Sequence, residues 1–204
     1  MKRQRHLVVF VKAPRLGAVK TRLARDIGAL AAWRFYRETT ARTIRRLGHD
    51  PRWRFYIAVA PDRFARRGRF WPSRLARRAQ GSGDLGARME RVMRDLPPGA
   101  VVIVGSDIPE LSAPRVAGAF RALESHDAVF GPAPDGGYWL VGASRRGRRR
   151  YFFHRVRWST CHALADTLAN LGPGTRIALL EQLADIDTGA DLVRAGRGTA
   201  KTRA

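Results

Sequence analysis

Two kinds of apolar pattern alternate along the chain. Short runs rich in Val, Ile and Phe, bounded by turn residues, predict buried β-strands. Longer segments with apolar residues at three- and four-residue spacing predict amphipathic helices. The predicted strands cover residues 7–11, 53–60, 100–105, 127–131, 138–142 and 177–180. The predicted helices cover residues 21–47, 87–96, 113–123 and 160–171, and the first of them is broken at Gly28. Residues 183–191 lead into a further short helix. Strands alternating with helices, without an internal repeat or linker, predict a single α/β domain over residues 1–204 with a mainly parallel sheet, followed by a frayed tail from about residue 196.

Asp107 follows the most continuous apolar β-type run, residues 100–105, which we place at the centre of the sheet. Ligands of open α/β sheets bind beyond the carboxyl ends of the strands. A carboxylate there can hold a divalent metal against phosphate oxygens. The alternative is that Asp107 caps the next helix, which the intervening Ile108 and Pro109 make less natural.

The first strand leads into a glycine-containing turn and a basic helix start. Thr21 is the predicted N-cap of that helix. A helix N-terminus behind such a loop can bind anions, and Lys12, Lys20 and Arg22 direct the site towards phosphate. The segment matches neither GxxxxGK[ST] nor GxGxxG. The alternative is an ordinary strand–helix turn with solvated basic residues.

A second pair of carboxylates lies late in the chain. Asp185 and Asp187 are two residues apart, so in an extended segment both would point to the same face. The alternative, favoured by spacing alone, is that Asp187 or Thr188 caps the last helix. Asp135, Gly136 and Gly137 form a turn signal that suits a hairpin connection, although glycine would also let backbone approach a sugar or base closely.

The composition is strongly basic. The 204 residues carry a formal net charge of +22, and lysine occurs only at positions 2, 12, 20 and 201. Much of the arginine lies in residues 63–78 and 145–157. One interpretation is a nucleic-acid footprint; the other is a bias towards arginine on solvated surfaces. Because no nucleic-acid-binding motif accompanies the charge, we expect no specific nucleic-acid partner, only non-specific adhesion at low salt.

No stretch is apolar for long enough to span a membrane or to act as a signal peptide, so we expect a soluble cytoplasmic protein. The single cysteine excludes a disulfide framework and a cysteine-based metal site.

Six motifs together carry a family resemblance. They occur in the order KAPRLGAVKTRLA, GSGDLGARM, GSDIPELS, GPAPDGGYWLVG, RWST and ADIDTGADL. The chain thereby resembles, over about residues 7–193, a bacterial family of GT-A-like glycosyltransferases known as a domain of unknown function. Some members are called arsenosugar-biosynthesis or radical-SAM-associated transferases. The family is similar to phospholactate guanylyltransferases and to molybdenum-cofactor nucleotidyltransferases.

The resemblance implies a nucleotide-diphospho-sugar transferase (GT-A, Rossmann-like) fold and a set of site residues. The implied phosphate contacts are Lys12, Gly17, Lys20 and Arg22, and the implied metal ligands for Mg²⁺ or Mn²⁺ are Asp107 and Asp187. Residues 84–86, including Asp84 and Gly86, would line the nucleotide side of the cleft, and Asp135, Gly136 and Gly137 the acceptor side.

The resemblance departs from the family pattern at one position, where Ile108 replaces the usual cysteine after the metal aspartate. The motif Ser-Asp-Ile also supplies one carboxylate where glycosyltransferases of this fold often have two. We therefore expect a metal-dependent transferase that uses a nucleotide donor and a small-molecule acceptor, with Asp107, Lys20 and Arg22 in catalysis. Glycosyl transfer from a nucleotide-diphosphate sugar ranks first, nucleotidyl transfer from a nucleoside triphosphate to an anionic acceptor second, and a non-catalytic basic nucleic-acid-binding protein last.

Overall fold

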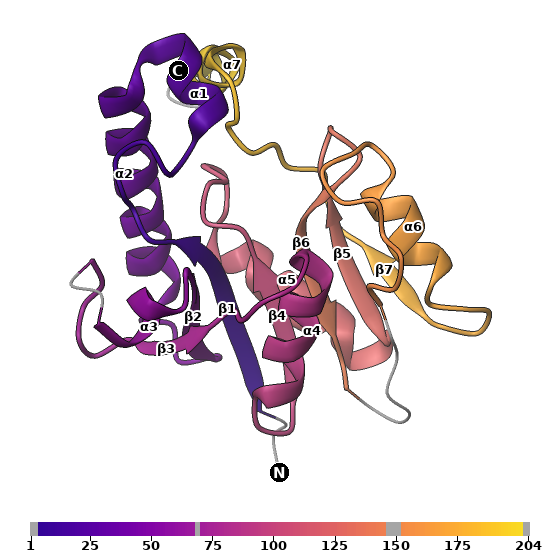
Figure 1. The fold of residues 1–204 in the computed structure, drawn as a ribbon. Helices are drawn as coiled ribbons and strands as arrows, with labels where there is room; N and C mark the ends of the chain where they lie inside the picture. The colour runs from indigo at the N-terminus through magenta and orange to yellow at the C-terminus, as the bar shows by residue number, and fades with distance from the viewer. Residues whose placement is uncertain (1–3, 68–69, 146–151, 202–204) are drawn as a thin grey trace.

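The computed structural model describes residues 4–67, 70–145 and 152–201, which form one α/β domain around a seven-stranded sheet (Figure 1). The strands are β1 (Arg5–Lys12), β2 (Arg54–Ala60), β3 (Ala76–Ala79), β4 (Ala100–Val104), β5 (Ala128–Pro132), β6 (Tyr138–Ala143) and β7 (Ile177–Leu179). The helices are α1 (Thr21–Ile27), α2 (Ala29–Leu47), α3 (Arg63–Arg67), α4 (Leu85–Asp95), α5 (Ala113–Ser125), α6 (Ala163–Ala169) and α7 (Gly189–Lys201).

The sheet has the order β3-β2-β1-β4-β6-β5-β7. Strand β6 pairs antiparallel with β4 and β5, whereas the other pairings are parallel. The mainly parallel sheet predicted from the pattern is therefore confirmed, and β4 lies at its centre as predicted. In a parallel sheet the carboxyl ends of neighbouring strands meet at one edge, which places the loops after β1 and β4 side by side.

Successive residues of the central strands supply two separate cores. On β4, Val102 and Val104 pack with α2 and α5 on one face, and Val101 and Ile103 pack with α4 and α6 on the other. This alternation follows from the two-residue period of a strand. Because both faces are covered by helices, the strand reads as a continuous apolar run.

The sequence pattern missed β3 and misplaced one helix cap. Residues 76–79 (ARRA) pair with β2 at the edge of the sheet, but they lie in an arginine run and lack an apolar alternation. The N-cap of α1 is Lys20 rather than Thr21, which is the first helical residue. Helix α7 extends to Lys201 and so takes in most of the segment predicted as a frayed tail. Residues 202–204, and residues 146–151 of the second arginine run, lie outside the described residues.

The last part of the chain returns across the molecule. Figure 1 shows the segment after β7 crossing from the β7 edge to α7, which lies against α1 at the opposite side. The backbone N–H of Gly189 donates to the Asp26 carboxylate at 2.7 Å and fixes this contact. Among the described residues, no helix is both long and apolar enough to cross a membrane.

Candidate active site

Asp107 lies three residues beyond the end of β4, at the carboxyl edge of the sheet. It does not cap the following helix, because the N-cap of α5 is Ser112. Gly105 leaves little space beside it: a Cβ at this position would lie 3.2 Å from Asp107 Oδ1 and 2.9 Å from Ile108 Cδ1. The tight turn after the central strand thus determines where the Asp107 carboxylate lies.

Asp185 and Asp187 reach the same place from the segment that crosses to α7. Ile186, between them, is buried in a small cluster with Leu23 and Ala32 of α1 and α2. The two flanking side chains therefore point the other way, as the two-residue period predicts. One carboxylate oxygen from each of Asp107, Asp185 and Asp187 lies within 4.8 Å of the others. We call these three residues the acidic triad.

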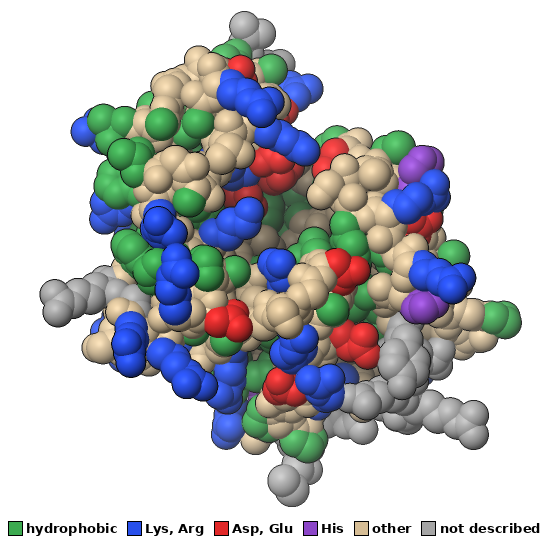
Figure 2. Space-filling view, viewed as in Figure 1, with side chains coloured by type: hydrophobic (Ala, Val, Ile, Leu, Met, Phe, Trp, Pro, Cys, Tyr) green, Lys and Arg blue, Asp and Glu red, His purple; other side chains and the backbone are tan. Residues whose placement is uncertain are grey.

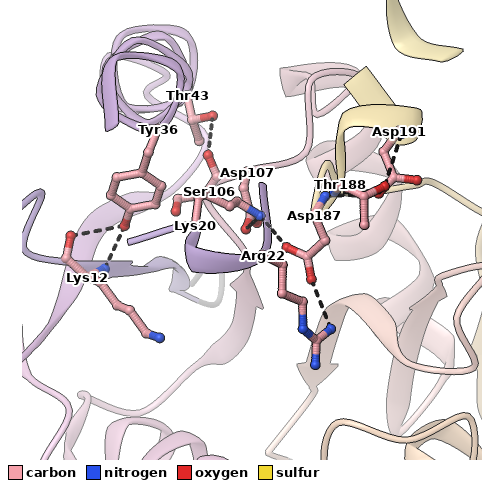
Figure 3. Close-up of polar contacts among 10 residues, drawn as sticks. All are labelled: Lys12, Lys20, Arg22, Tyr36, Thr43, Ser106, Asp107, Asp187, Thr188 and Asp191. Carbon is pink, nitrogen blue, oxygen red and sulfur yellow. Dashed lines mark hydrogen bonds and ion pairs between the residues drawn. The ribbon is translucent and has the colours of Figure 1, made fainter. Parts of the chain in front are cut away.

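Lys20 lies against the triad and is almost fully buried. Its Nζ is 2.6 Å from Asp107 Oδ2 and 2.6 Å from Asp187 Oδ1, and its side chain is 6% exposed (Figure 3). The Lys20 backbone is left-handed, with φ 48° and ψ 46°. For a residue with a Cβ, this conformation costs about 1–2 kcal/mol. Such strain persists where the surroundings fix the residue, commonly at functional sites.

Charge and burial shift two pKa values in the cluster. Burial alone would lower the pKa of Lys20, but the Asp107 and Asp187 carboxylates outweigh it and raise the pKa, so the ammonium stays charged. Burial, and then the negative charges of Asp107 and Asp187, raise the pKa of Asp185 to about 6. A crowded acidic site of this kind favours a bound cation.

Arg22 approaches the triad from the solvent side, whereas Lys12 does not approach it. Arg22 Nη1 is 3.6 Å from Asp187 Oδ2, and its side chain is 67% exposed. The Lys12 backbone N–H donates to the Tyr36 hydroxyl at 2.7 Å, and its exposed side chain ends apart from Asp107 and Asp187 (Figure 3). Gly17 lies in an exposed turn with φ 75°. The first loop therefore brings Lys20 and Arg22, but not Lys12, into contact with the triad.

A capping box at the start of α7 holds Asp187 in place. The Asp191 carboxylate accepts hydrogen bonds from the backbone N–H groups of Asp187 (3.1 Å) and Thr188 (2.8 Å) and from the Thr188 hydroxyl. The Asp191 N–H in turn donates to Thr188 Oγ1 at 3.3 Å. Thr188 thus caps the helix, as one alternative predicted, and this leaves the Asp187 side chain free to meet Lys20.

Asp84 and Gly86 have clear local roles in the structure. Asp84 caps α4, since its Oδ1 accepts from the Ala87 N–H at 2.8 Å. A Cβ on Gly86 would lie 2.5 Å from Phe153 Cβ and 2.7 Å from a ring carbon of Trp158, so only glycine allows this packing. Their predicted nucleotide contacts stay a prediction.

Asp135, Gly136 and Gly137 form the hairpin between β5 and β6, as the turn signal predicts. Asp135 Oδ1 accepts from the Gly137 N–H at 2.9 Å. Gly136 has φ 81°, and a Cβ there would lie 2.1 Å from the carbonyl oxygen of Cys161. The charge of Asp135 also contributes to the raised pKa of Asp185, which places this turn within electrostatic range of the triad.

The sequence pattern does not predict the full roles of several residues of the site. The sequence predicts only that Asp185 shares a face with Asp187, and it predicts no role for Asp191 or Tyr36. The T-x-x-D spacing of Thr188 and Asp191 is a recognisable capping signature. Tyr36 reads as part of the apolar stripe of α2, and no sequence signal indicates that its hydroxyl holds the end of β1.

Figure 2 shows the face around the site hollowed, with acidic side chains gathered in the hollow and Lys and Arg side chains around it. The hollow, the triad and the buried ammonium together form a polar site at the carboxyl edge of the sheet.

Comparison with protein families matches residues 43–160 to a family described as "Uncharacterized protein conserved in bacteria (DUF2064)". The chain belongs to this family. A search of curated proteins finds no match.

Solved structures with similar folds match this DUF2064 protein over most of both chains. A candidate nucleotide-diphospho-sugar transferase from Desulfovibrio desulfuricans G20 is 29% identical, with TM-score 0.81 over 90% of this chain and 82% of that chain. Rv0371c from Mycobacterium tuberculosis H37Rv, in complex with manganese, is 16% identical, with TM-score 0.56 over 94% and 97%. The 4-diphosphocytidyl-2C-methyl-D-erythritol synthase from Anaerococcus prevotii DSM 20548 is 10% identical, with TM-score 0.57 over 97% and 99%. These likenesses confirm the transferase-type α/β fold that the motifs implied.

The donor set of the triad fits a hard divalent cation. Three carboxylates from two separate loops offer oxygen ligands within reach of one ion. Mg²⁺ and Mn²⁺ both prefer such ligands, with water and phosphate oxygens completing the coordination.

Proposed function

We propose that this DUF2064 protein is a divalent-metal-dependent transferase that uses a nucleotide donor, and that it transfers a glycosyl group from a nucleotide-diphosphate sugar to a small-molecule acceptor. One observation carries the proposal: the convergence of Asp107, Asp185 and Asp187 on the buried Lys20 at the carboxyl edge of the sheet. The likeness to the Desulfovibrio desulfuricans transferase supports glycosyl transfer in particular.

The residues of the triad would hold the cation, and the basic residues would hold the donor. Asp107 and Asp187 would bind Mg²⁺ or Mn²⁺, with Asp185 offering a third oxygen. A bound divalent ion would neutralise charge on the donor phosphates as the leaving group departs. Lys20 would add a point charge, and Arg22 could bind phosphate through two parallel hydrogen bonds.

The remaining predicted residues would line the two sides of the cleft. Lys12, Gly17, Asp84 and Gly86 would lie on the nucleotide side. The turn at residues 135–137 would lie on the acceptor side, where its backbone N–H and C=O groups could meet a sugar or another polar molecule.

Nucleotidyl transfer is the second candidate. It is favoured by the fold shared with the diphosphocytidyl-methylerythritol synthase. The basic residues of the first loop, Lys12, Lys20 and Arg22, would also suit a triphosphate. A non-catalytic basic binding protein ranks last, because it would leave the triad without a role.

Product analysis separates the two enzyme candidates. The protein would be incubated with Mg²⁺ or Mn²⁺, a panel of nucleotide-diphosphate sugars and nucleoside triphosphates, and a set of small acceptors. Metal-dependent release of nucleoside diphosphate would support glycosyl transfer, and release of pyrophosphate would support nucleotidyl transfer. Release of neither product under any combination would contradict both.

Asp107→Ala tests the metal role directly. Loss of a preorganised electrostatic contact commonly costs about 2.7–4 kcal/mol in the barrier, so turnover should fall by at least about a hundredfold. The matched control is Asp95→Ala, which removes an exposed carboxylate paired only with the adjacent Arg94 in the described structure and should leave turnover unchanged. Retention of more than about a tenth of the wild-type rate in folded Asp107→Ala would reject the role.

A further inference from the structure

We propose that Lys20 is a displaceable counter-ion of the acidic triad, so that its ammonium and a divalent cation compete for the same carboxylate oxygens. Metal binding would release the Lys20 side chain from Asp107 and Asp187 and make it available to an anionic ligand. The inference rests on the proposed function of this site, but its test does not require turnover.

The contacts of Lys20 are those of an ion held by the triad. Its Nζ bridges one oxygen of Asp107 and one of Asp187, each at 2.6 Å. The two carboxylates come from residues 87 and 167 positions away in the chain, and the ammonium joins them in the way a bound metal ion would. Figure 3 shows the Lys20 side chain lying between the two aspartates.

The Lys20 ammonium and a divalent cation would repel each other if both contacted the same carboxylate oxygens. Mg²⁺ approaches carboxylate oxygens to about 2.0–2.1 Å, closer than an ammonium does. An ion bound to the oxygens that Lys20 contacts would therefore lie beside the ammonium and repel it. Arg22 could not provide the same internal neutralisation, because it reaches Asp187 at 3.6 Å from an exposed position.

The position of Lys20 in the chain favours movement of its side chain rather than of the loop. The Lys20 carbonyl accepts the Ala24 N–H at 2.8 Å, and the residue caps α1 through its backbone alone. The side chain therefore has no part in holding the helix end. It can leave the carboxylates by rotating about its own bonds, while the left-handed backbone stays in place.

The first test measures Mn²⁺ affinity without nucleotide, by titration calorimetry or by the paramagnetic signal of free Mn²⁺. Lys20→Met keeps the length of the side chain and removes the competing charge, so Mn²⁺ should bind at least about tenfold more tightly than to wild type. The matched control is Arg25→Met, which removes one positive charge from the last turn of the same helix, outside the triad. Equal affinities of Lys20→Met and wild type would overturn the inference, as would an equal gain in both variants.

The second test uses the wild-type protein and so does not depend on the folding of a variant. Lysines occur only at positions 2, 12, 20 and 201, so acylation by an amine-reactive reagent can be followed by mass spectrometry with three internal standards. Buried and ion-paired Lys20 should react slowly without metal and several-fold faster with saturating Mn²⁺, while Lys12 changes little. Unchanged or slower acylation of Lys20 at saturating Mn²⁺ would overturn the inference.

The outcomes separate this inference from the proposed function. Metal-dependent turnover with equal Mn²⁺ affinities would overturn displacement alone. Tighter Mn²⁺ binding by Lys20→Met, together with no turnover of any nucleotide by the wild-type protein, would support displacement and contradict the proposed function.

Discussion

Arg22 should contribute little to the stability of the protein but substantially to nucleotide binding. Its contact with Asp187 is long and exposed, and such surface pairs contribute about 0–1 kcal/mol to stability. Arg22→Ala should therefore change the free energy of unfolding by less than about 0.5 kcal/mol. If Arg22 binds donor phosphate, the same change should weaken nucleotide binding by at least about tenfold, since a hydrogen bond to a charged group is worth about 1.5–3 kcal/mol.

Calorimetric titration with nucleotide and thermal unfolding of the same samples check both parts. Arg25→Ala, on the same helix, serves as the control for lost positive charge. A large loss of stability with unchanged nucleotide affinity would mean that Arg22 is structural.

His6 should make the stability of the protein depend on pH. It is fully buried on β1, and its Nε2 lies 3.4 Å from the Pro98 carbonyl oxygen. Burial lowers the pKa of His6 below 6.5, and the charges of Arg145 and Arg54 add to the effect. Below pH 6.5 the unfolded chain thus binds more protons than the folded one, so stability is lost as pH falls.

Chemical denaturation between pH 7 and pH 5 measures this effect. The free energy of unfolding of wild type should fall by up to about 1.4 kcal/mol per pH unit relative to His6→Gln, which keeps a donor for the Pro98 carbonyl. Parallel curves for the two proteins over this range would show that His6 does not titrate differently in the folded state.

At the scale of the element, the capping box of α7 links helix stability to the position of Asp187. Asp191→Ala removes the acceptor of three hydrogen bonds at the helix start. We expect it to destabilise the protein by about 1 kcal/mol and to weaken Mn²⁺ binding, because Asp187 loses its backbone anchor.

The control for Asp191→Ala is Arg194→Ala. This variant removes the exposed ion pair with Asp191 but leaves the carboxylate in the cap. Equal losses of stability in the two variants would assign the effect to the ion pair rather than to the cap.

Most elements of the fold could be predicted from periodicity because the sheet is covered on both faces. Continuous apolar runs such as residues 100–104 have few other interpretations, and the helix break at Gly28 is visible in the sequence. Strand β3 could not be found in this way. It is an exposed edge strand of small and charged residues, and its pairing with β2 rather than its own pattern makes it a strand.

The site was partly predictable for a different reason. Asp107 and Lys20 lie next to predicted strand and helix ends, so the rules for open α/β sheets place them at one edge. The direction of Asp185 and Asp187 depends on Ile186, which packs against helices far earlier in the chain. The left-handed backbone of Lys20 likewise cannot be predicted from this residue or from the residues next to it in the sequence.

At the scale of the whole molecule, the site depends on the segment after β7, which crosses the molecule and brings Asp185 and Asp187 to Lys20. Lys20 and Asp187 are 167 residues apart and meet only because the segment after β7 crosses the carboxyl edge of the sheet to reach α1 (Figure 1). The N-terminal third of the chain therefore supplies Lys20, the middle third supplies Asp107, and the C-terminal third supplies Asp185 and Asp187. Arginine dominates the formal net charge of +22, and Figure 2 shows acidic side chains gathered in a hollow that Lys and Arg side chains surround.

The central claim is that the acidic triad binds a divalent metal together with a nucleotide. A thermal-shift panel tests it most directly, using nucleotide-diphosphate sugars and nucleoside triphosphates, each with and without Mg²⁺ or Mn²⁺, on wild type and Asp107→Ala. A ligand at about 100 times its dissociation constant adds about 2.7 kcal/mol of stability, enough for a shift of several degrees. We predict a metal-dependent shift with nucleotide-diphosphate sugars in wild type that is lost in Asp107→Ala. The absence of a metal-dependent shift with every nucleotide would contradict the account.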